Sequence, residues 1–177
     1  ENDELFSKYL PTFDAIAVRE KSAVKKVQSF VSGKVVDVLD PTLLLAKEEY
    51  ALLEVETPEM YKKPYILSYF LTHDPAVVDY TNMIAEKLGL RVIHYFADYP
   101  DRVFDTDAGC FAFAGPGEFL GYIKNAQYVF TNSFHGTCFS MIYRKAFSTY
   151  TANSALISRV IDMVENLVME EQCFENF

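Results

Sequence analysis

The heptapeptide Thr131-Asn132-Ser133-Phe134-His135-Gly136-Thr137 marks a change in the hydrophobic pattern of the chain. Residues 126–130 form an apolar run typical of a buried strand, and residues 138–143 continue with apolar side chains at helical spacing. A strand-to-helix turn is therefore predicted, with a helix near residues 136–143. The first N–H groups of a helix have no partner inside it, and the helix dipole adds positive potential there. The pattern predicts that this turn binds a phosphate or a carboxylate.

His135 and Gly136 suggest that this turn could do more than bind an anion. A histidine has an unperturbed pKa near physiological pH, so His135 can add a positive charge or transfer a proton. Gly136 lets the backbone approach a ligand closely. From the heptapeptide alone, a hydrogen-bonded structural histidine in a tight turn is an equally good interpretation.

Strands and helices alternate along the rest of the chain. Strands are expected at residues 14–18, 35–39, 65–70, 91–96, 127–131 and 146–150. Further helices are expected at residues 21–31, 75–88, 116–125 and about 154–169. This order predicts an α/β fold, a Rossmann-like parallel sheet with helices on both faces.

Ligands of such sheets bind beyond the C-terminal ends of the strands. Three segments have that position: the turn at 131–136, Arg19 after the first strand, and residues 71–74 after the strand at 65–70. The sequence therefore places Arg19 and His135 in candidate ligand-binding positions.

Composition and charge restrict the partners. The net charge of −9 argues against a broad nucleic-acid-binding surface, because phosphate backbones are held mainly by Lys and Arg. A local cluster of Arg19, Lys21, Arg144 and Lys145 could still bind a small anion. No apolar run is long enough to span a membrane.

The cysteines and histidines do not form a metal motif. Three widely spaced cysteines suit a reducing compartment. His135 and Cys138 are three residues apart, but no CxxC or second histidine pair completes a site, so a buried structural Cys138 is expected.

Four segments together resemble the polysaccharide pyruvyl transferase family. They are "TNSFHGTCFSMIYRKAF" at residues 131–147, "FDAIAVREKSAV" at 13–24, "VVDVLDPTLLL" at 35–45 and "PGEFLGYIKNAQYVFTNSFHG" at 116–136. They occur in the family's order, and the resemblance covers residues 9 to about 150. Members are roughly twice as long and resemble two-domain glycosyltransferases of the GT-B type, so a fragment is expected.

The resemblance implies a domain division. Residues 1–45 would end the N-terminal half, residues 46–63 would be a polar linker, and residues 64–177 would form the Rossmann-like, donor-binding C-terminal half.

The resemblance also implies a reaction. The pyruvyl group of phosphoenolpyruvate would be transferred to two hydroxyls of a cell-surface or exopolysaccharide sugar, giving a ketal and phosphate. The acceptor would be a saccharide or a lipid-linked glycan. No cofactor besides this co-substrate and no metal are expected. The setting implied is the bacterial cytoplasm, in capsule or cell-wall polysaccharide synthesis, with no membrane span and peripheral contact with the inner membrane left open.

Site residues carry over from the matching motifs. His135 is the candidate acid/base or phosphate ligand, and Arg19 of the "VRE" block is the candidate bidentate anion ligand. Substrate contacts are expected from Asn132, Ser133, Phe134, Gly136 and Thr137.

These functional assignments have purely structural alternatives. Arg19 could pair with Glu20 or be exposed, and Glu20 and Lys21 are expected to be solvated. Asp40 before Pro41 is expected to cap the following turn, with an acceptor contact as the alternative. For the whole chain, the alternatives are a nucleotide-sugar glycosyltransferase or a non-catalytic half-domain with anion affinity.

Overall fold

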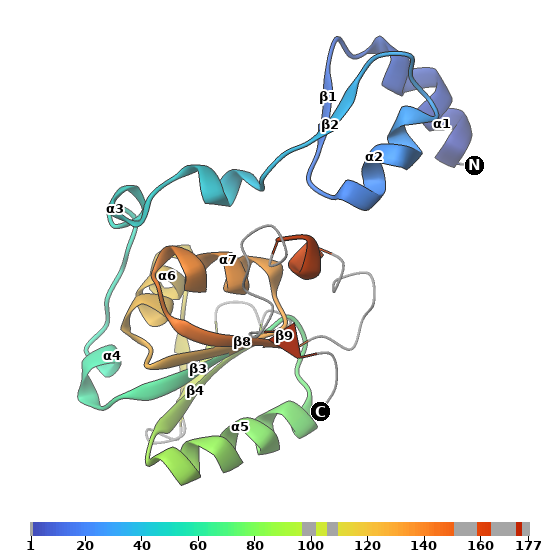
Figure 1. The fold of residues 1–177 in the computed structure, drawn as a ribbon. Helices are drawn as coiled ribbons and strands as arrows, with labels where there is room; N and C mark the ends of the chain where they lie inside the picture. Colours follow the sequence, from blue (N-terminus) through green and yellow to red (C-terminus); the bar gives the residue numbers. More distant parts are fainter. Residues whose placement is uncertain (1, 97–101, 106–109, 151–158, 164–172, 175–177) are drawn as a thin grey trace.

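The computed structural model describes residues 2–96, 102–105, 110–150, 159–163 and 173–174. Its main body is a seven-stranded sheet of strand order β6-β5-β4-β3-β7-β8-β9 (Figure 1). The strands are β3 (Tyr65–Phe70), β4 (Arg91–Phe96), β5 (Arg102–Asp105), β6 (Cys110–Phe113), β7 (Tyr128–Thr131), β8 (Ala146–Tyr150) and β9 (Cys173–Phe174). β4, β3, β7, β8 and β9 run parallel, while β5 and β6 pair antiparallel at one edge. The predicted α/β, Rossmann-like fold is confirmed.

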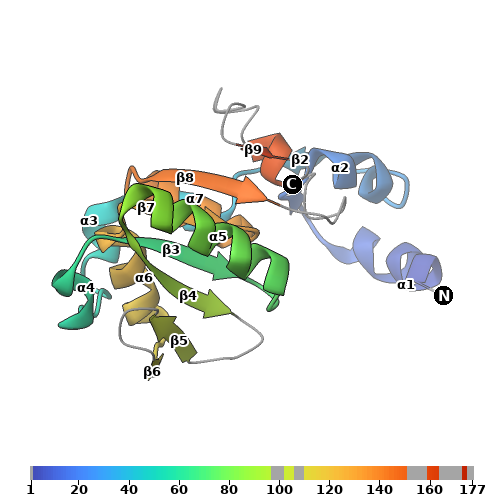
Figure 2. The ribbon, with the colours of Figure 1, turned by 90° about the horizontal axis from the view of Figure 1, so that it is seen from below.

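Helices cover both faces of the sheet. α5 (Pro75–Leu88) crosses one face, and α6 (Pro116–Asn125) and α7 (Phe134–Ile142) lie on the other (Figures 1 and 2). Side chains alternate along β3: Tyr65 and Leu67 join the core beneath α6, whereas Ile66 and Phe70 pack on the α5 side. Because both faces are buried, β3 is apolar along nearly its whole length, as parallel strands require.

The helix boundaries follow local signals. Asp74 accepts a hydrogen bond from the Ala76 N–H at 2.9 Å and begins α5, which ends at Gly89 with a left-handed φ of 64°. Glu118 accepts the Gly115 N–H at 2.9 Å at the start of α6, as expected for a stabiliser of the first turn. These signals explain why the sequence predicts both helices with their observed bounds.

A second, smaller unit precedes the sheet. It contains α1 (Asn2–Tyr9), the 3₁₀ turn η1 (Leu10–Thr12), β1 (Ile16–Val18), α2 (Lys21–Gln28) and β2 (Val35–Asp37). β1 and β2 pair in parallel, and the unit stands apart from the main sheet, on the side of α6 and α7 (Figure 1). The single turn η2 (Pro41–Leu44) then leads toward the main body.

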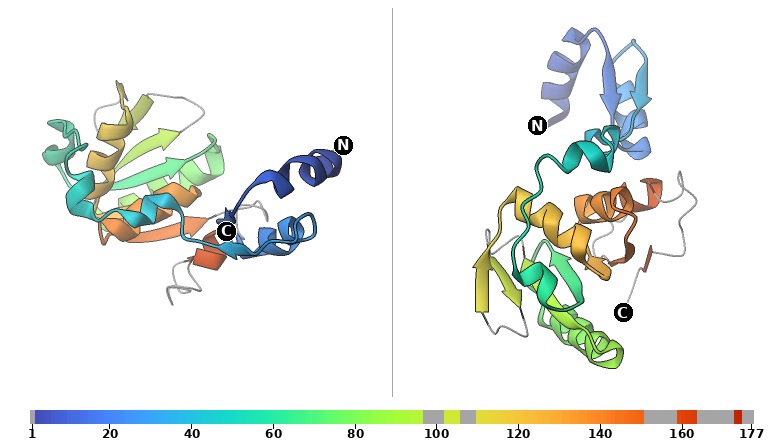
Figure 3. Two further views of the ribbon diagram at one scale, coloured as in Figure 1. Left: turned by 90° about the horizontal axis from the view of Figure 1, so that it is seen from above. Right: turned by 90° about the vertical axis from the view of Figure 1, so that its left-hand side faces the viewer.

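Residues 46–63 are fastened to the main body along their length. The segment contains two short helices, α3 (Lys47–Tyr50) and α4 (Glu59–Lys62), and runs down beside α6 (Figure 3). Glu54 accepts from Tyr143 at 2.8 Å and pairs with Lys124, while the Val55 N–H donates to the Gly117 carbonyl at 3.0 Å. Residues 46–63 therefore contain two single helical turns and pack against the main body. The polar composition of this segment does not predict either feature.

Several elements differ from the sequence-based expectations. The edge strands β5 and β6 are only four residues each and lie within residues 97–117, a stretch of sequence rich in Asp, Pro and Gly that resembles a loop. α1 and β9 were also not expected. Of the helix expected at 154–169, residues 159–163 are helical, and the others lie outside the described residues.

His94 on β4 makes the fold sensitive to acid. Its side chain is 2 % exposed, its Nε2 lies 3.2 Å from Asn82 Oδ1, and its Nδ1 has no partner within the described residues. Burial, with a smaller contribution from the charge of nearby His73, lowers the pKa of His94 from 6.5 to about 4. Between pH 4 and 6.5, the unfolded chain therefore binds more protons at His94 than the folded chain does.

We expect the free energy of unfolding to fall as pH drops from about 6.5 to 4, with a His94 contribution of roughly 3 kcal/mol. Urea unfolding of the wild type and of His94→Gln at pH 7 and pH 4.5 measures it. The variant should lose less stability than the wild type over this range. Equal losses would show that His94 does not carry the effect.

Candidate active site

Asp40 brings together three segments that are distant in sequence. It follows β2, is 5 % exposed, and caps η2 by accepting the Thr42 N–H at 2.9 Å, as expected. Arg19, directly after β1, donates through Nη1 to Asp40 Oδ2. His135 in the first turn of α7 places Nε2 3.9 Å from Asp40 Oδ1, within ion-pair distance when the imidazole is protonated. The structure thus joins Arg19 and His135 through one carboxylate.

The surroundings of Asp40 keep it ionised. Burial alone would raise its pKa, but hydrogen bonds from Thr42 and Arg19, together with the Arg19 charge, outweigh burial and lower the pKa below its ordinary value of 3.8. A buried carboxylate with these donors is a fixed negative charge. It can hold the guanidinium of Arg19 and the imidazole of His135 in place.

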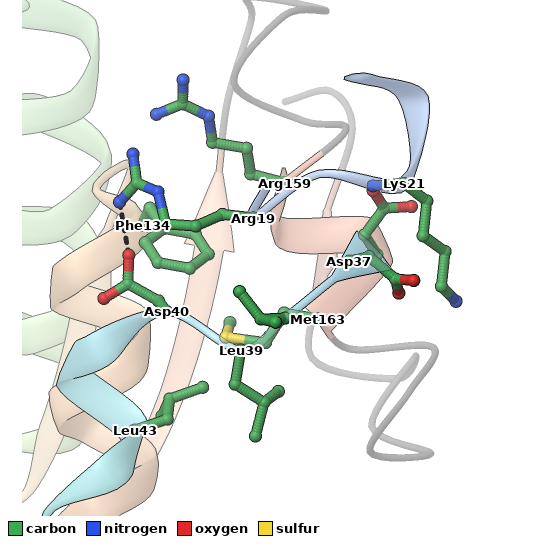
Figure 4. A pocket seen from close by; sticks show the side chains of 11 residues that line it. Arg19, Lys21, Asp37, Leu39, Asp40, Leu43, Phe134, Arg159 and Met163 are labelled. Atoms are coloured by element: carbon green, nitrogen blue, oxygen red, sulfur yellow. Dashed lines mark hydrogen bonds and ion pairs between the residues drawn. The ribbon is translucent and has the colours of Figure 1, made fainter. Parts of the chain in front are cut away.

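A cavity of about 280 Å³ is lined by Arg19 and Asp40 of this cluster, but not by His135 (Figure 4). Its volume is near the lower end of the range of about 300–1,000 Å³ typical of small-molecule sites. Its lining has three basic side chains, Arg19, Lys21 and Arg159, three carboxylates, Asp37, Asp40 and Asp162, and apolar side chains that include Phe134 and Met163. In Figure 4 the Arg19 guanidinium points to Asp40, with the ring of Phe134 next to them. The basic and acidic lining groups are equal in number, so individual groups such as the guanidinium groups of Arg19 and Arg159, rather than a net positive charge, would bind an anionic ligand.

The start of α7 is built by the heptapeptide itself. Ser133 Oγ accepts the Gly136 N–H at 3.2 Å, and the Ser133 carbonyl accepts the Thr137 N–H at 3.0 Å. The N–H groups of Phe134 and His135 have no partner inside the helix, because they precede its first hydrogen bond. These two N–H groups are the ones available to an anion at this turn.

The other residues expected to contact substrate have structural partners in this turn. Asn132 Oδ1 accepts the Leu71 N–H at 2.8 Å, joining the ends of β7 and β3. Thr137 is fully buried, with its hydroxyl 2.7 Å from that of Thr149. A Cβ at Gly136 would lie 2.5 Å from Thr131 Oγ1, so the glycine allows α7 to approach the sheet rather than a ligand. Asn132, Ser133, Gly136 and Thr137 thus shape the turn, and Phe134 lines the cavity.

The comparison with known families decides the family of this chain. The model of the polysaccharide pyruvyl transferase family matches residues 1–151 of the 177 residues. The chain belongs to the polysaccharide pyruvyl transferase family. No curated protein and no solved structure matches it. The family name indicates a transferase that acts on polysaccharide, and the matched segment contains Arg19, Asp40 and His135.

Two residues of the expected cation cluster, Arg144 and Lys145, do not line the cavity, and neither does His73. Arg144 and Lys145 follow α7, at the opposite end of the helix from His135. His73, in the turn after β3, packs against Phe96 with ring centroids 5.0 Å apart.

Glu20 and Arg159 lie near the site and were not identified from the sequence. Glu20 was expected to be solvated but pairs with Arg159 Nε, and Arg159 lines the cavity. Lys21 is exposed, as expected, and its backbone N–H donates to Asp162 Oδ2 at 3.3 Å. No sequence signal points to these contacts, because Arg159 lies beyond the family match and 139 residues from Glu20.

The remaining groups of interest have structural positions. Cys138 is fully buried against Met163, and burial raises its thiol pKa to about 12, as expected of a structural cysteine. Among the described residues, no cluster of His, Cys, Asp and Glu is arranged to hold a metal ion. No helix in that part of the chain has the length and apolar character needed to cross a membrane.

Proposed function

We propose that this protein transfers the pyruvyl group of phosphoenolpyruvate to two hydroxyls of a cell-surface or exopolysaccharide sugar, forming a ketal and releasing phosphate. The observation that supports the proposal is the convergence of Arg19 and His135 on Asp40, three residues of the family's segments, where Arg19 and Asp40 line a cavity. The acceptor is a saccharide or a lipid-linked glycan, and the reaction takes place in the cytoplasm. It uses no further cofactor.

The chemistry requires a proton donor and anchors for anions. A proton added to the methylene carbon of phosphoenolpyruvate gives a methyl group and a cationic C2, which one sugar hydroxyl attacks. The second hydroxyl displaces the phosphate group as the C2–O bond breaks. One of the two hydroxyl protons balances the new methyl group, and the other leaves with phosphate. An acid in position and charge-assisted contacts to phosphate supply these requirements.

Residues of the site match these tasks. His135 is the proposed acid, and α7 places its Nε2 3.9 Å from Oδ1 of Asp40, which lines the cavity. Arg19 binds the phosphate group with its remaining N–H donors, because only Nη1 is engaged by Asp40 among the described residues. The N–H groups of Phe134 and His135 at the helix start add two donors.

The test is a ketal assay with the full-length protein. Phosphoenolpyruvate is mixed with a panel of saccharides and lipid-linked glycans, and phosphate release is followed while the acceptor is analysed by mass spectrometry. We expect phosphate release that requires an acceptor, together with a mass gain of one pyruvic acid minus one water.

Reactions in D₂O add a second readout. One deuterium should enter the methyl group of the ketal, because that carbon receives its proton from an exchangeable acid. Sugar transfer from a nucleotide sugar by the same protein, with phosphoenolpyruvate left intact across the panel, would contradict the proposal and support a glycosyltransferase.

A further inference from the structure

Arg159 reaches the cavity from a part of the chain outside the family match. It begins the short helical stretch at 159–163, whereas the match ends at residue 151. Arg159 lines the same cavity as Arg19, and both are drawn in Figure 4. The cavity therefore contains a second guanidinium that the family's motifs do not supply.

The stretch that carries Arg159 is held on two sides. Val160 and Met163 are buried in a cluster with Cys138 of α7. On the other side, Asp162 Oδ2 accepts the Lys21 N–H at 3.3 Å, and Glu20 pairs with Arg159. These contacts fix the Arg159 backbone relative to both α7 and the end of β1.

Glu20 occupies only one edge of the Arg159 guanidinium. Its Oε1 accepts from Nε, and among the described residues no hydrogen bond or ion pair involves Nη1 or Nη2 of Arg159. The Arg159 side chain is 38 % exposed, so these terminal groups are accessible. The four N–H donors of the two terminal nitrogens can bind a carboxylate in a fork. Because Glu20 directly follows Arg19, the pair also holds Arg159 next to the proposed phosphate anchor.

We propose that Arg159 binds the carboxylate of phosphoenolpyruvate while Arg19 and the start of α7 bind its phosphate. This inference rests on the proposed donor. Two anionic groups on one small molecule need two cationic anchors, and the cavity offers Arg19 and Arg159 from two separate parts of the chain. Glu20 positions Arg159 without occupying the donors that the carboxylate uses.

Calorimetric titration of the full-length protein with two probes tests the assignment. Arg159→Ala should weaken phosphoenolpyruvate binding roughly tenfold to a hundredfold, the loss expected for a charge-assisted pair of hydrogen bonds. The affinity for inorganic phosphate should be unchanged, because phosphate lacks the carboxylate. Arg19→Ala should weaken the binding of both probes. Arg159→Lys should restore only part of the affinity, because a point charge does not form the fork.

Lys25→Ala serves as the matched control. Lys25 is exposed on α2 and does not line the cavity, so this variant removes one positive charge without removing an anchor. Thermal melting confirms that each variant is folded, and Arg159→Gln replaces Arg159→Ala if the latter is not.

The outcomes separate this inference from the proposed function. Suppose that the wild type binds phosphoenolpyruvate. If Arg159→Ala then loses affinity equally for phosphoenolpyruvate and inorganic phosphate, or for neither, the assignment of the carboxylate to Arg159 is wrong. If the wild type binds phosphoenolpyruvate no more tightly than inorganic phosphate, the proposal that phosphoenolpyruvate is the donor is contradicted.

Discussion

Replacing His135 by alanine should lower the turnover number by roughly a hundredfold or more, because a positioned general acid contributes about 10²- to 10⁴-fold. The KM for phosphoenolpyruvate should change much less. His135 lies 3.9 Å from Asp40, a residue that lines the cavity, and its side chain is 52 % exposed, so its removal leaves no buried group without a partner. The measurement is steady-state kinetics of ketal formation.

His73→Ala is the matched control for this variant. His73 is an exposed histidine that packs on Phe96 away from the cavity, so its removal should leave the turnover number unchanged. His135→Gln keeps polarity but donates no acidic proton and should remain as slow as His135→Ala. An increase in KM with a normal turnover number in both His135 variants would make His135 an anchor for phosphate rather than the acid.

Replacing Arg19 by alanine should mainly weaken the binding of phosphoenolpyruvate, by roughly tenfold to a hundredfold, because charge-assisted hydrogen bonds contribute about 1.5–3 kcal/mol. Arg19→Lys should not fully restore binding, since lysine does not reproduce the planar fork. Initial rates over a range of phosphoenolpyruvate concentrations give the KM of each variant.

A structural loss must be separated from the loss of a ligand contact in this case. Arg19→Ala leaves the Asp40 carboxylate buried without its ion-pair partner, which costs stability in its own right. The double variant Arg19→Ala/Asp40→Asn removes that unpaired charge and should recover thermal stability without recovering phosphoenolpyruvate binding. Recovery of binding together with stability would show that Arg19 acts only through the fold.

Much of the fold follows from local patterns in the sequence. β3, β4, β8, α5 and α6 have the bounds expected from apolar runs, helix caps and the glycine at residue 89. His135 was expected in the first turn of a helix after a strand, and it lies there because Ser133 caps that helix. These features depend on neighbours in sequence, which the pattern of side chains records directly.

Contacts between distant segments were not predictable in the same way. Asp40 was identified as a cap, and the cap is confirmed, but its contacts with Arg19 and His135 depend on how the β1–β2 unit docks near α7. Arg159 gave no signal, because a single arginine in an amphipathic stretch resembles any solvated charge. The motif resemblance located Arg19 and His135, and tertiary structure supplied the carboxylate between them.

The two ion pairs at the cavity connect the same two parts of the molecule with opposite polarity. Arg19 on the β1 side meets Asp40, which η2 anchors near α7, whereas Glu20 on the β1 side meets Arg159, which Val160 and Met163 anchor to α7. Each side of the contact therefore presents one cation and one anion. An arrangement shifted by one residue would bring Glu20 toward Asp40 or Arg19 toward Arg159, and either contact would set like charges against each other. The opposite charges of the neighbouring residues Arg19 and Glu20 therefore favour the observed pairing over one shifted by a residue.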